Sequence, residues 1–335
     1  MRHLSIVIVT RNEEAGIARC IESVLGAVEG RDAEVVLVDS ASTDRTVEIA
    51  SDYPITILQL DRSAELSPAA GRYIGARETS GAYIHFLDGD MIVIEGWLSA
   101  AFEAMSDPSL AAVGGRIYRV YPGEEPSRTH TDQYVVGPIA SLGGAGLYRR
   151  TAIDASGGFN PFVKGEEERE LGHRIAQQGF TIMRLDVPMA YHLEKPRTLT
   201  EITEKAGHFV GVGQLLRVHR GTALATDILT RQRRVLRDSA MVVIPAIVAA
   251  IVFITGGPVT RQLLVALSLL SVLGLGATGR LRKAVLALRF RTAVALNIVR
   301  GFVRGIPPPA RYSGIVHRLR EAGSSNRSEV APSSR

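Results

Sequence analysis

Short apolar runs alternate with segments of helical spacing along the N-terminal part of the chain. The first of these runs is continuous and rich in β-branched residues, as in a strand that is buried on both faces of a sheet. The apolar runs are 4–9, 34–38, 55–60 and 82–87, and the helical segments between them are 13–25, 42–51 and 68–79. This alternation predicts an α/β fold with a mostly parallel sheet wound with helices.

Polar residues directly follow three of these apolar runs. The first run leads into Thr10 to Glu13, the second into Asp39, and the fourth into the triplet Asp88-Gly89-Asp90. The carboxyl ends of parallel strands lie at one edge of a sheet, and open α/β sheets bind their ligands at that edge. The pattern therefore predicts a polar ligand site formed by these residues.

Beyond the fourth run the pattern becomes less regular. We expect a helix over 96–105, a strand over 111–120, a polar connection over 121–138 and a glycine-rich segment over 143–146. The acidic run 166–170 opens a helix ending near Gln178, a strand follows over 180–185, and 199–220 is mostly helical. We predict that a first domain covers 1–228.

Two uncharged apolar stretches, 240–255 and 263–278, lie near the C-terminal end. Helices of about eighteen residues reach roughly 27 Å, close to the roughly 30 Å hydrocarbon core of a bilayer. We predict a transmembrane hairpin over 239–256 and 262–279, and a buried helical pair in a soluble domain is the alternative. Arginines on both sides of the hairpin place its two ends in the cytoplasm.

Arginines also recur within the apolar sequence 284–306. Arg282, Arg289, Arg300 and Arg304 fall on one side of a helix, which suits a helix that lies in the headgroup plane with its arginine stems snorkelling. A third span is the less favoured alternative, because Arg289 and Arg291 would lie near the middle of the bilayer. We expect a membrane unit over 229–310 and a disordered tail over 311–335.

The net charge of +5 is divided unevenly along the chain. Residues 231–320 hold 15 Lys or Arg and one acid, whereas residues 1–230 hold 22 basic and 31 acidic residues. Because the positive excess lies in the apolar part, it favours an anionic phospholipid surface as the partner and argues against nucleic acid. The single cysteine, Cys20, excludes an internal disulfide and a thiolate zinc site.

No secretory signal opens the sequence, because the apolar run 4–9 is short and is followed at once by polar residues. We therefore expect a multi-pass protein of the cell membrane whose N-terminal domain lies in the cytoplasm.

The triplet Asp88-Gly89-Asp90 is a candidate cation site. Two carboxylates two residues apart in an extended chain point the same way, and the glycine lets the backbone turn between them. Such a pair can hold a hard divalent cation and leave positions open for phosphate oxygens. Asp-Gly between apolar runs is also a strong hairpin signal, which is the alternative for this triplet.

Several segments, taken in order, resemble those of family-2 glycosyltransferases over roughly residues 3–195. They are SIVIVTRNE (5–13), VVLVDSASTDRT (35–46), the helix with Gly71, Arg72 and Gly75, the acidic triplet, 143–150, Gly157-Gly158-Phe159 and the acidic helix start at 166–171. The resemblance implies a GT-A fold over 1–228, a nucleotide-diphosphate sugar donor, inversion at the anomeric carbon and a divalent cation, Mg²⁺ or Mn²⁺.

By position, the resemblance assigns the donor site. Thr10, Asn12 and Glu13 would line the nucleotide pocket, and Asp39 would accept a hydrogen bond from the base. Asp88 would contact the ribose or the metal, and Asp90 would bind the metal. An acid at a strand end can also simply cap the residues that follow it, here Ser42 or Thr43, and this alternative for Asp39 stays open.

The resemblance also assigns residues to the diphosphate and to the acceptor. Arg72 would lie near the diphosphate, although it could instead be a charge on a helix surface. Glu168 would be the general base that deprotonates the acceptor hydroxyl, with Glu167 and Glu166 as rivals. Acids in a first helical turn also stabilise the helix dipole, which is the structural alternative. His192 would complete the metal site, or would simply be packed or solvated.

These observations together predict a membrane-anchored inverting glycosyltransferase of cell-envelope or exopolysaccharide synthesis. Its acceptor would be membrane-associated, either a lipid-linked glycan or a polyprenyl phosphate. The alternative is a non-catalytic membrane scaffold that keeps the fold and binds nucleotide or partner proteins.

Overall fold

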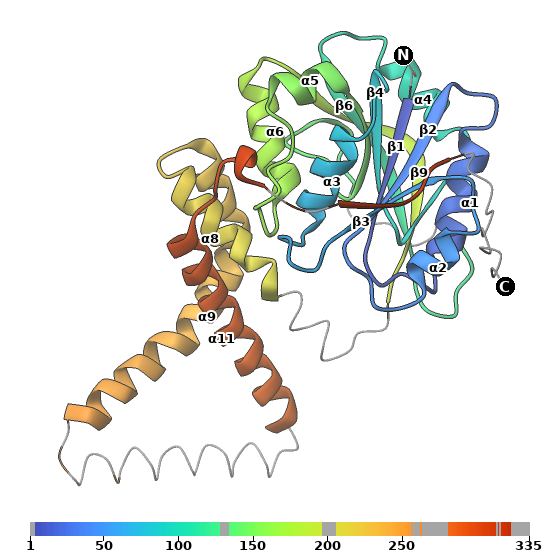
Figure 1. Ribbon diagram of the computed structural model, residues 1–335. Coiled ribbons are helices and arrows are strands. Elements are labelled where there is room, and N and C mark those ends of the chain that lie inside the picture. The colour runs from blue at the N-terminus through green and yellow to red at the C-terminus, as the bar shows by residue number, and fades with distance from the viewer. Residues whose placement is uncertain are drawn as a thin grey trace, which may run out of the picture. The chain divides into compact units, whose positions relative to one another are not determined.

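The computed structural model describes residues 4–127, 134–195, 206–255, 281–312 and 316–322, and the single residues 257, 262 and 314. The chain forms two compact units (Figure 1). The first consists of Met1–Phe162, Glu167–Pro196 and Pro308–Arg335, and the second of Val163–Glu166 and Arg197–Pro307. The division therefore falls earlier than the predicted boundary at 229, and the end of the chain belongs to the first unit.

The first unit is built on a sheet with the strand order β10-β3-β2-β1-β4-β8-β6-β9-β5, and β7 pairs with β9. One half of this sheet is parallel, as predicted: β1 pairs in parallel with β2 and β4, and β2 with β3. The strands of this half are β1 (Leu4–Thr10), β2 (Ala33–Asp39), β3 (Thr56–Leu60) and β4 (Tyr83–Asp88).

The other half of the sheet shows that the prediction of a mostly parallel sheet was wrong, because the sheet is mixed. β8 runs antiparallel to both β4 and β6, and β5 and β7 run antiparallel to β9, whereas β6 and β9 are parallel. The regular alternation of strand and helix stops after β4, so crossover helices no longer impose parallel pairing. These strands are β5 (Met91–Val93), β6 (Leu110–Val120), β7 (Gly137–Ile139), β8 (Ala145–Arg149) and β9 (Thr181–Leu193).

Helices cover both faces of the sheet, and alternate residues of β1 show how. Leu4, Ile6 and Ile8 belong to the apolar cluster that includes α1 and α4, whereas Val7 and Val9 belong to the cluster that includes α3, α5 and α6. Both faces of the central strand are thus buried, which explains its uninterrupted apolar run. The helices are α1 (Ile17–Ala27), α2 (Thr46–Ala50), α3 (Pro68–Arg77), α4 (Trp97–Ala104), α5 (Arg150–Ala155) and α6 (Glu167–Gln177).

Helix α3 lies unusually close to β1. A Cβ atom at Gly71 would lie 2.6 Å from a methyl carbon of Val9, and one at Gly75 would lie 2.2 Å from a methyl carbon of Val7. Both glycines are therefore required for this packing. Arg72, which follows Gly71 in this closely packed helix, is buried.

The tail after residue 311, predicted to be disordered, contains a strand. β10 (Val316–Arg320) pairs antiparallel with β3 at the edge of the sheet, and η1 (Pro309–Arg311) precedes it. The ring of Tyr312 packs edge-on against those of Tyr73 and Phe162. The prediction failed because β3 offers an unpaired backbone edge, and short polar segments can pair with such an edge without an apolar pattern of their own.

The second unit contains α8 (Phe209–Val218), α9 (Ala223–Thr255) and α11 (Leu281–Arg304). Helices α8 and α11 touch through their backbones, since a Cβ atom at Gly213 would lie 1.9 Å from the Ile298 carbonyl oxygen. A Cβ atom at Gly301 would lie equally close, at 1.9 Å, to the Val210 carbonyl oxygen. The predicted helix at 284–306 thus exists, and one side of it is packed against α8.

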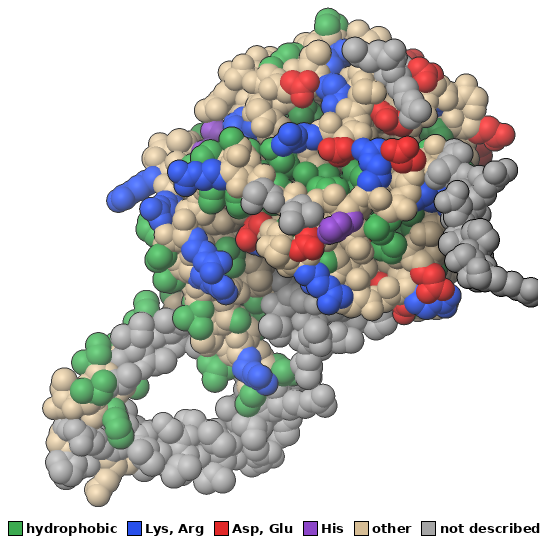
Figure 2. All heavy atoms as spheres, viewed as in Figure 1, with side chains coloured by type: hydrophobic (Ala, Val, Ile, Leu, Met, Phe, Trp, Pro, Cys, Tyr) green, Lys and Arg blue, Asp and Glu red, His purple; other side chains and the backbone are tan. Residues whose placement is uncertain are grey.

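Within the described residues, no helix combines the length and the apolar character that crossing a membrane requires. The predicted hairpin therefore gains no support. Its first limb, 239–256, coincides with the end of α9, and its second limb, 262–279, lies outside the described residues apart from Gln262. Hydrophobic side chains are nevertheless exposed along α9 (Figure 2), among them Met241 at 67 % and Ile244 at 59 %.

Candidate active site

Three parallel strands end side by side, which brings the polar residues predicted from the sequence to one edge of the sheet. In the register of the sheet, Thr10 lies opposite Asp39, and Val9 lies opposite Asp88. Thr10 and Asp39 are buried. The hydroxyl oxygen of Thr10 is a buried polar atom with no hydrogen-bond partner among the described residues.

The acidic triplet forms a bend, and the hairpin alternative is wrong. β4 pairs with β1 and β8, whereas β5, which starts right after the triplet, pairs with β9. The Gly89 N–H donates to the Val9 carbonyl at 2.9 Å, and a Cβ atom at Gly89 would lie 2.6 Å from the Thr10 hydroxyl oxygen. The glycine therefore lets the bend lie against the end of β1.

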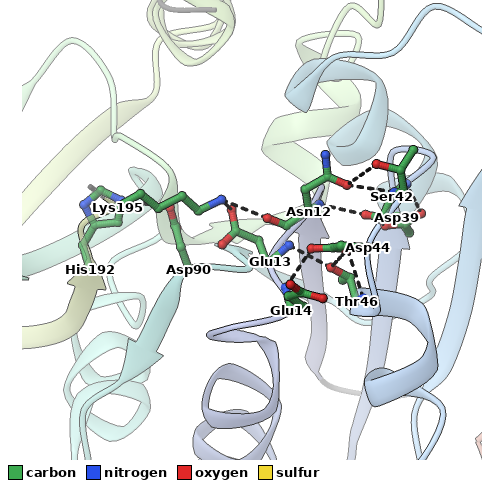
Figure 3. Close-up of polar contacts among 11 residues, drawn as sticks. Asn12, Glu13, Glu14, Asp39, Ser42, Asp44, Thr46, Asp90, His192 and Lys195 are labelled. Carbon is green, nitrogen blue, oxygen red and sulfur yellow. Dashed lines mark hydrogen bonds and ion pairs between the residues drawn. The ribbon is translucent and has the colours of Figure 1, made fainter. Parts of the chain in front are cut away.

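The loop after β1 is fixed to the loop after β2 (Figure 3). The Asn12 N–H donates to the Ser42 hydroxyl at 2.8 Å, and the Asn12 side-chain oxygen accepts from the Thr43 N–H at 2.8 Å. The Glu13 N–H donates to the Thr46 hydroxyl at 2.7 Å. The backbone of Asn12 has a positive φ of 55°, a conformation that asparagine adopts more readily than most residues.

Asp39 caps the turn that follows it, as the structural alternative predicted. Its carboxylate accepts from the Ser42 N–H at 2.9 Å and from the Ser42 hydroxyl, and it accepts from the Gln59 side-chain amide at 2.9 Å. The contact with a nucleotide base remains a prediction.

Arg72 lies at the centre of a buried ionic cluster and is not a surface charge. Its guanidinium group is 2.8 Å from Asp88, 2.8 Å from Glu167 and 3.1 Å from Glu168, and its side chain is 2 % exposed. It also lies over the ring of Phe159, 5.7 Å from the centroid. The structure thus brings together one strand-end acid and two acids from the start of α6. We call Arg72, Asp88, Glu167 and Glu168 the Arg72 cluster.

Burial and crowding perturb the acids of the Arg72 cluster. Burial is the largest cause that raises the pKa of Glu167, followed by the charge of Glu168, and Arg72 opposes the shift. The pKa of Asp88 is raised by burial first, while Arg72 lowers it and Asp90 raises it. Of the two glutamates, Glu168 is the more accessible, with 19 % of its side chain exposed against 7 % for Glu167.

Asp90 and His192 form a second group of polar side chains at the same edge. The Nε2 atom of His192 lies 3.1 Å from Oδ2 of Asp90, because His192 of β9 lies opposite Met91 of β5. The other ring nitrogen of His192 lies 3.4 Å from Glu194. The hydrogen bond with Asp90 is the main cause that raises the pKa of His192.

The other carboxylate oxygen of Asp90, Oδ1, is buried and has no hydrogen-bond partner among the described residues. A buried carboxylate oxygen without a partner is costly, so a ligand or water is expected to satisfy it. No group of three or more His, Cys, Asp or Glu side chains in the described part of the chain is arranged to hold a metal ion by itself.

A divalent cation nevertheless fits these residues. Mg²⁺ and related cations are often bound by one or two carboxylates together with substrate phosphates and water. Asp90 provides the free buried oxygen, with His192 beside it. We therefore regard Asp90 and His192 as the residues that would hold the cation, and Asp88 as a weaker candidate since Arg72 already binds one of its oxygens.

Lys195 is a site residue that the sequence analysis missed. Its ammonium nitrogen lies 2.5 Å from a carboxylate oxygen of Glu13 and 3.0 Å from the Asn12 carbonyl oxygen (Figure 3). Burial raises the pKa of Glu13 to about 7, against the lowering effect of Lys195. Lys195 lies three residues after His192, a candidate metal-binding residue, and this proximity in the sequence was the signal that could have identified it.

Residues 5–165 match the sequence profile of the family described as "Glycosyl transferase family 2". Among curated proteins, the chain is 28 % identical over 135 residues to glycosyltransferase AglE of Haloferax volcanii, which covers 39 % of this chain and 44 % of that protein. It is 25 % identical over 228 residues to the pre-mycofactocin glycosyltransferase of Mycobacterium tuberculosis, covering 61 % of this chain and 46 % of that protein. The chain thus spans less than half the length of these two relatives.

Among solved structures, the mannosyltransferase PcManGT of Pyrobaculum calidifontis, in complex with GDP-Man and Mn²⁺, superposes with a TM-score of 0.54. The alignment covers 89 % of this chain and 87 % of that one at 18 % identity, which shows a shared GT-A-like fold. The chain is therefore similar to family 2 glycosyltransferases over residues 5–165, and its fold is GT-A-like.

Proposed function

We propose that the protein is an inverting, cation-dependent glycosyltransferase. It moves a sugar from a nucleotide-diphosphate donor to a membrane-associated acceptor in the synthesis of an envelope glycan or exopolysaccharide. The observation that carries this proposal is the buried, unpartnered oxygen of Asp90 beside His192, at the strand-end edge of a sheet in a chain similar to family 2 glycosyltransferases.

The comparisons support a nucleotide-sugar donor. The PcManGT structure contains GDP-Man and Mn²⁺, and AglE and the Mycobacterium protein are both named as glycosyltransferases. In this chain, Thr10, Asn12, Glu13 and Asp39 would form the nucleotide side of the site. A divalent cation, when bound, would act as a Lewis acid that neutralises the departing diphosphate.

Glu168 is the residue we assign as the general base. It would take the proton from the acceptor hydroxyl as that oxygen attacks the sugar from the face opposite the diphosphate. Glu168 is more exposed than Glu167, and exposure is needed for contact with an acceptor. Glu166 is less suitable, because its carboxylate accepts a hydrogen bond from the Gln232 side chain of α9 at 3.0 Å.

We also propose that the second unit attaches the protein to the cytoplasmic face of a membrane rich in anionic phospholipid. Exposed apolar side chains recur on α9 at helical spacing, at Met241, Ile244, Val248 and Ile251. This part of the sequence also carries the excess of arginine. An acceptor such as polyprenyl phosphate or a lipid-linked glycan would then be presented at the same surface.

A screen of donors tests the proposed reaction. The full chain is incubated with Mn²⁺, vesicles that contain polyprenyl phosphate, and a panel of UDP- and GDP-sugars, and the released nucleoside diphosphate is measured. We expect release from at least one donor, loss of release in D90N, and retention in D154N, which alters an acid on α5 outside the site. Binding of nucleoside diphosphate without any turnover would favour the non-catalytic scaffold and contradict the proposal.

Vesicle flotation tests the proposed attachment. The protein should float with vesicles that contain anionic phospholipid, and more weakly with neutral vesicles. Equal absence from both kinds of vesicle would contradict membrane attachment without bearing on the reaction.

A further inference from the structure

A donor with a diphosphate brings negative charge to an edge that already carries several carboxylates. The site therefore needs cationic groups that can reach the donor. The family resemblance implies this task for Arg72, but that side chain is 2 % exposed and its guanidinium group already contacts three carboxylates. Moving it toward a donor would leave the buried Glu167 and the half-buried Asp88 and Glu168 without their cation, which is costly.

Lys195 is a cation at the same edge that is placed differently. Its side chain is 46 % exposed, and within the described residues its ammonium group forms an ion pair with one carboxylate, that of Glu13. A lysine side chain has a flexible stem, and its ammonium group is a compact point charge that is suited to phosphate. The exchange of one anionic partner for another therefore costs Lys195 little free energy.

The backbone just before Lys195 is anchored next to the acidic triplet. The Leu193 N–H donates to the Asp90 carbonyl at 2.8 Å, and the Glu194 N–H donates to the Val120 carbonyl at 2.8 Å. From this fixed point the side chain reaches across to the loop after β1, as Figure 3 shows. The ammonium group thus lies between the predicted nucleotide pocket, at Asn12 and Glu13, and the candidate cation ligands, Asp90 and His192. A diphosphate that joins a bound nucleoside to a bound cation must pass through this interval.

We propose that Lys195 is a donor-binding residue whose ammonium group contacts the diphosphate and that Glu13 holds it in place before the donor arrives. The inference rests on the proposed function, since it assumes a nucleotide-diphosphate donor. It assigns to Lys195 the role that the family resemblance implies for Arg72. No bond is made or broken in this step, because the ammonium group exchanges one anionic partner for another.

Isothermal titration calorimetry of the full chain in Mn²⁺ tests this assignment. UDP and GDP are titrated, and then the nucleoside that corresponds to the tighter binder. In K195M we expect the affinity for the diphosphate to fall by about 10- to 100-fold, the usual value of a hydrogen bond to a charged group. Nucleoside affinity should stay within about twofold of the wild type, and K195R should recover most of the loss in diphosphate affinity.

R45M is the matched control. Arg45 is an exposed cation on the loop before α2 that pairs with one carboxylate, Glu48, at 2.9 Å. If R45M lowers the affinity for the diphosphate as much as K195M does, the effect reflects the total charge of the protein, and the assignment is overturned. The assignment also fails if K195M binds the diphosphate with wild-type affinity. It fails as well if the affinities for nucleoside and diphosphate fall equally, as expected if Lys195 only stabilises the structure of the site.

The failure of the proposed function would look different. In that case the folded wild type would bind neither UDP nor GDP, and both the proposed function and the inference would be overturned together. If the wild type binds a nucleoside diphosphate and K195M binds it with the same affinity, the inference is overturned and the proposed function is not.

Discussion

Two groups of acids meet at the same edge of the sheet, and they differ in whether the protein supplies a partner for every carboxylate. In the Arg72 cluster, three carboxylates surround one buried guanidinium group at 2.8 to 3.1 Å. Around Asp90, one carboxylate oxygen pairs with His192, and the other is buried without a partner among the described residues. In the first group the protein itself supplies the partners of the charges, whereas the second group needs a ligand or water as the partner of its buried oxygen.

The difference separates structural from ligand-binding roles within a single site. A complete ionic cluster fixes its members, so Arg72 holds Glu168 and Asp88 at defined positions relative to each other. Around an incomplete group, a ligand that supplies the missing partner lowers the free energy, so ligand binding is favoured. On this account the region around Asp90, His192 and Lys195 binds the donor and its cation, and the Arg72 cluster positions the base.

The largest effect is expected from D90N, which removes the negative charge from the incomplete group. Turnover should fall by about 1,000-fold or more, because cation and diphosphate binding would be lost together. The measurement is the rate of nucleoside diphosphate release under saturating Mn²⁺. Turnover within about tenfold of the wild type would show that Asp90 is not the ligand that completes the site.

The next effect is expected from E168Q, which leaves the charge of the incomplete group intact. Turnover should fall by about 100- to 10,000-fold, the usual contribution of a general base, while donor affinity measured by calorimetry stays close to that of the wild type. E170Q is the control, because Glu170 pairs with Arg174 in the same helix at 2.6 Å and has no assigned role in transfer. Wild-type turnover in E168Q would contradict the base assignment.

R72M breaks the complete cluster and should act mainly on stability. Removing one partner of a buried ion pair costs about 3–5 kcal/mol, here because Glu167 stays buried without its cation. Denaturant unfolding measures this loss. The double variant R72M/E167Q should recover part of it, because one of the stranded carboxylates becomes neutral. A loss in R72M below about 1 kcal/mol would indicate that the cluster is not held by Arg72.

The smallest effect concerns Glu13 and pH. Its pKa is about 7 in the folded chain against 4.5 ordinarily, so the unfolded chain releases this proton at a lower pH than the folded chain. The contribution of Glu13 to stability therefore falls as pH rises from about 4.5 to about 7. E13Q should remove this decline, which is on the order of 2 kcal/mol. Unfolding curves at pH 5 and pH 8 that shift equally in both proteins would contradict this.

The parallel half of the sheet could be predicted from sequence because its strands are mostly buried and consist largely of apolar residues. The antiparallel half could not, because β9 is partly exposed along most of its length and β7 has three residues in a polar connection. β10 has an exposed, basic sequence, and its pairing depends on the free edge of β3. Such tertiary pairing leaves no periodic pattern in the sequence.

The candidate site shows the same limit. The strand-end acids Asp39, Asp88 and Asp90 could be located by their positions after apolar runs. The burial of Arg72 could not, because a single arginine in a helix has no pattern that separates a surface charge from the centre of an ionic cluster. Lys195 was missed because its partners, Asn12 and Glu13, are more than 180 residues away in the sequence.

The central claim is that the group around Asp90 is completed by a divalent cation together with a diphosphate. Electron paramagnetic resonance of Mn²⁺ tests it directly, because the signal of free Mn²⁺ falls as the ion binds. We predict that one equivalent of Mn²⁺ is bound by the wild type when the preferred nucleoside diphosphate is present, and that D90N binds none above the amount that the nucleotide itself retains. Equal Mn²⁺ binding by both proteins would contradict the account.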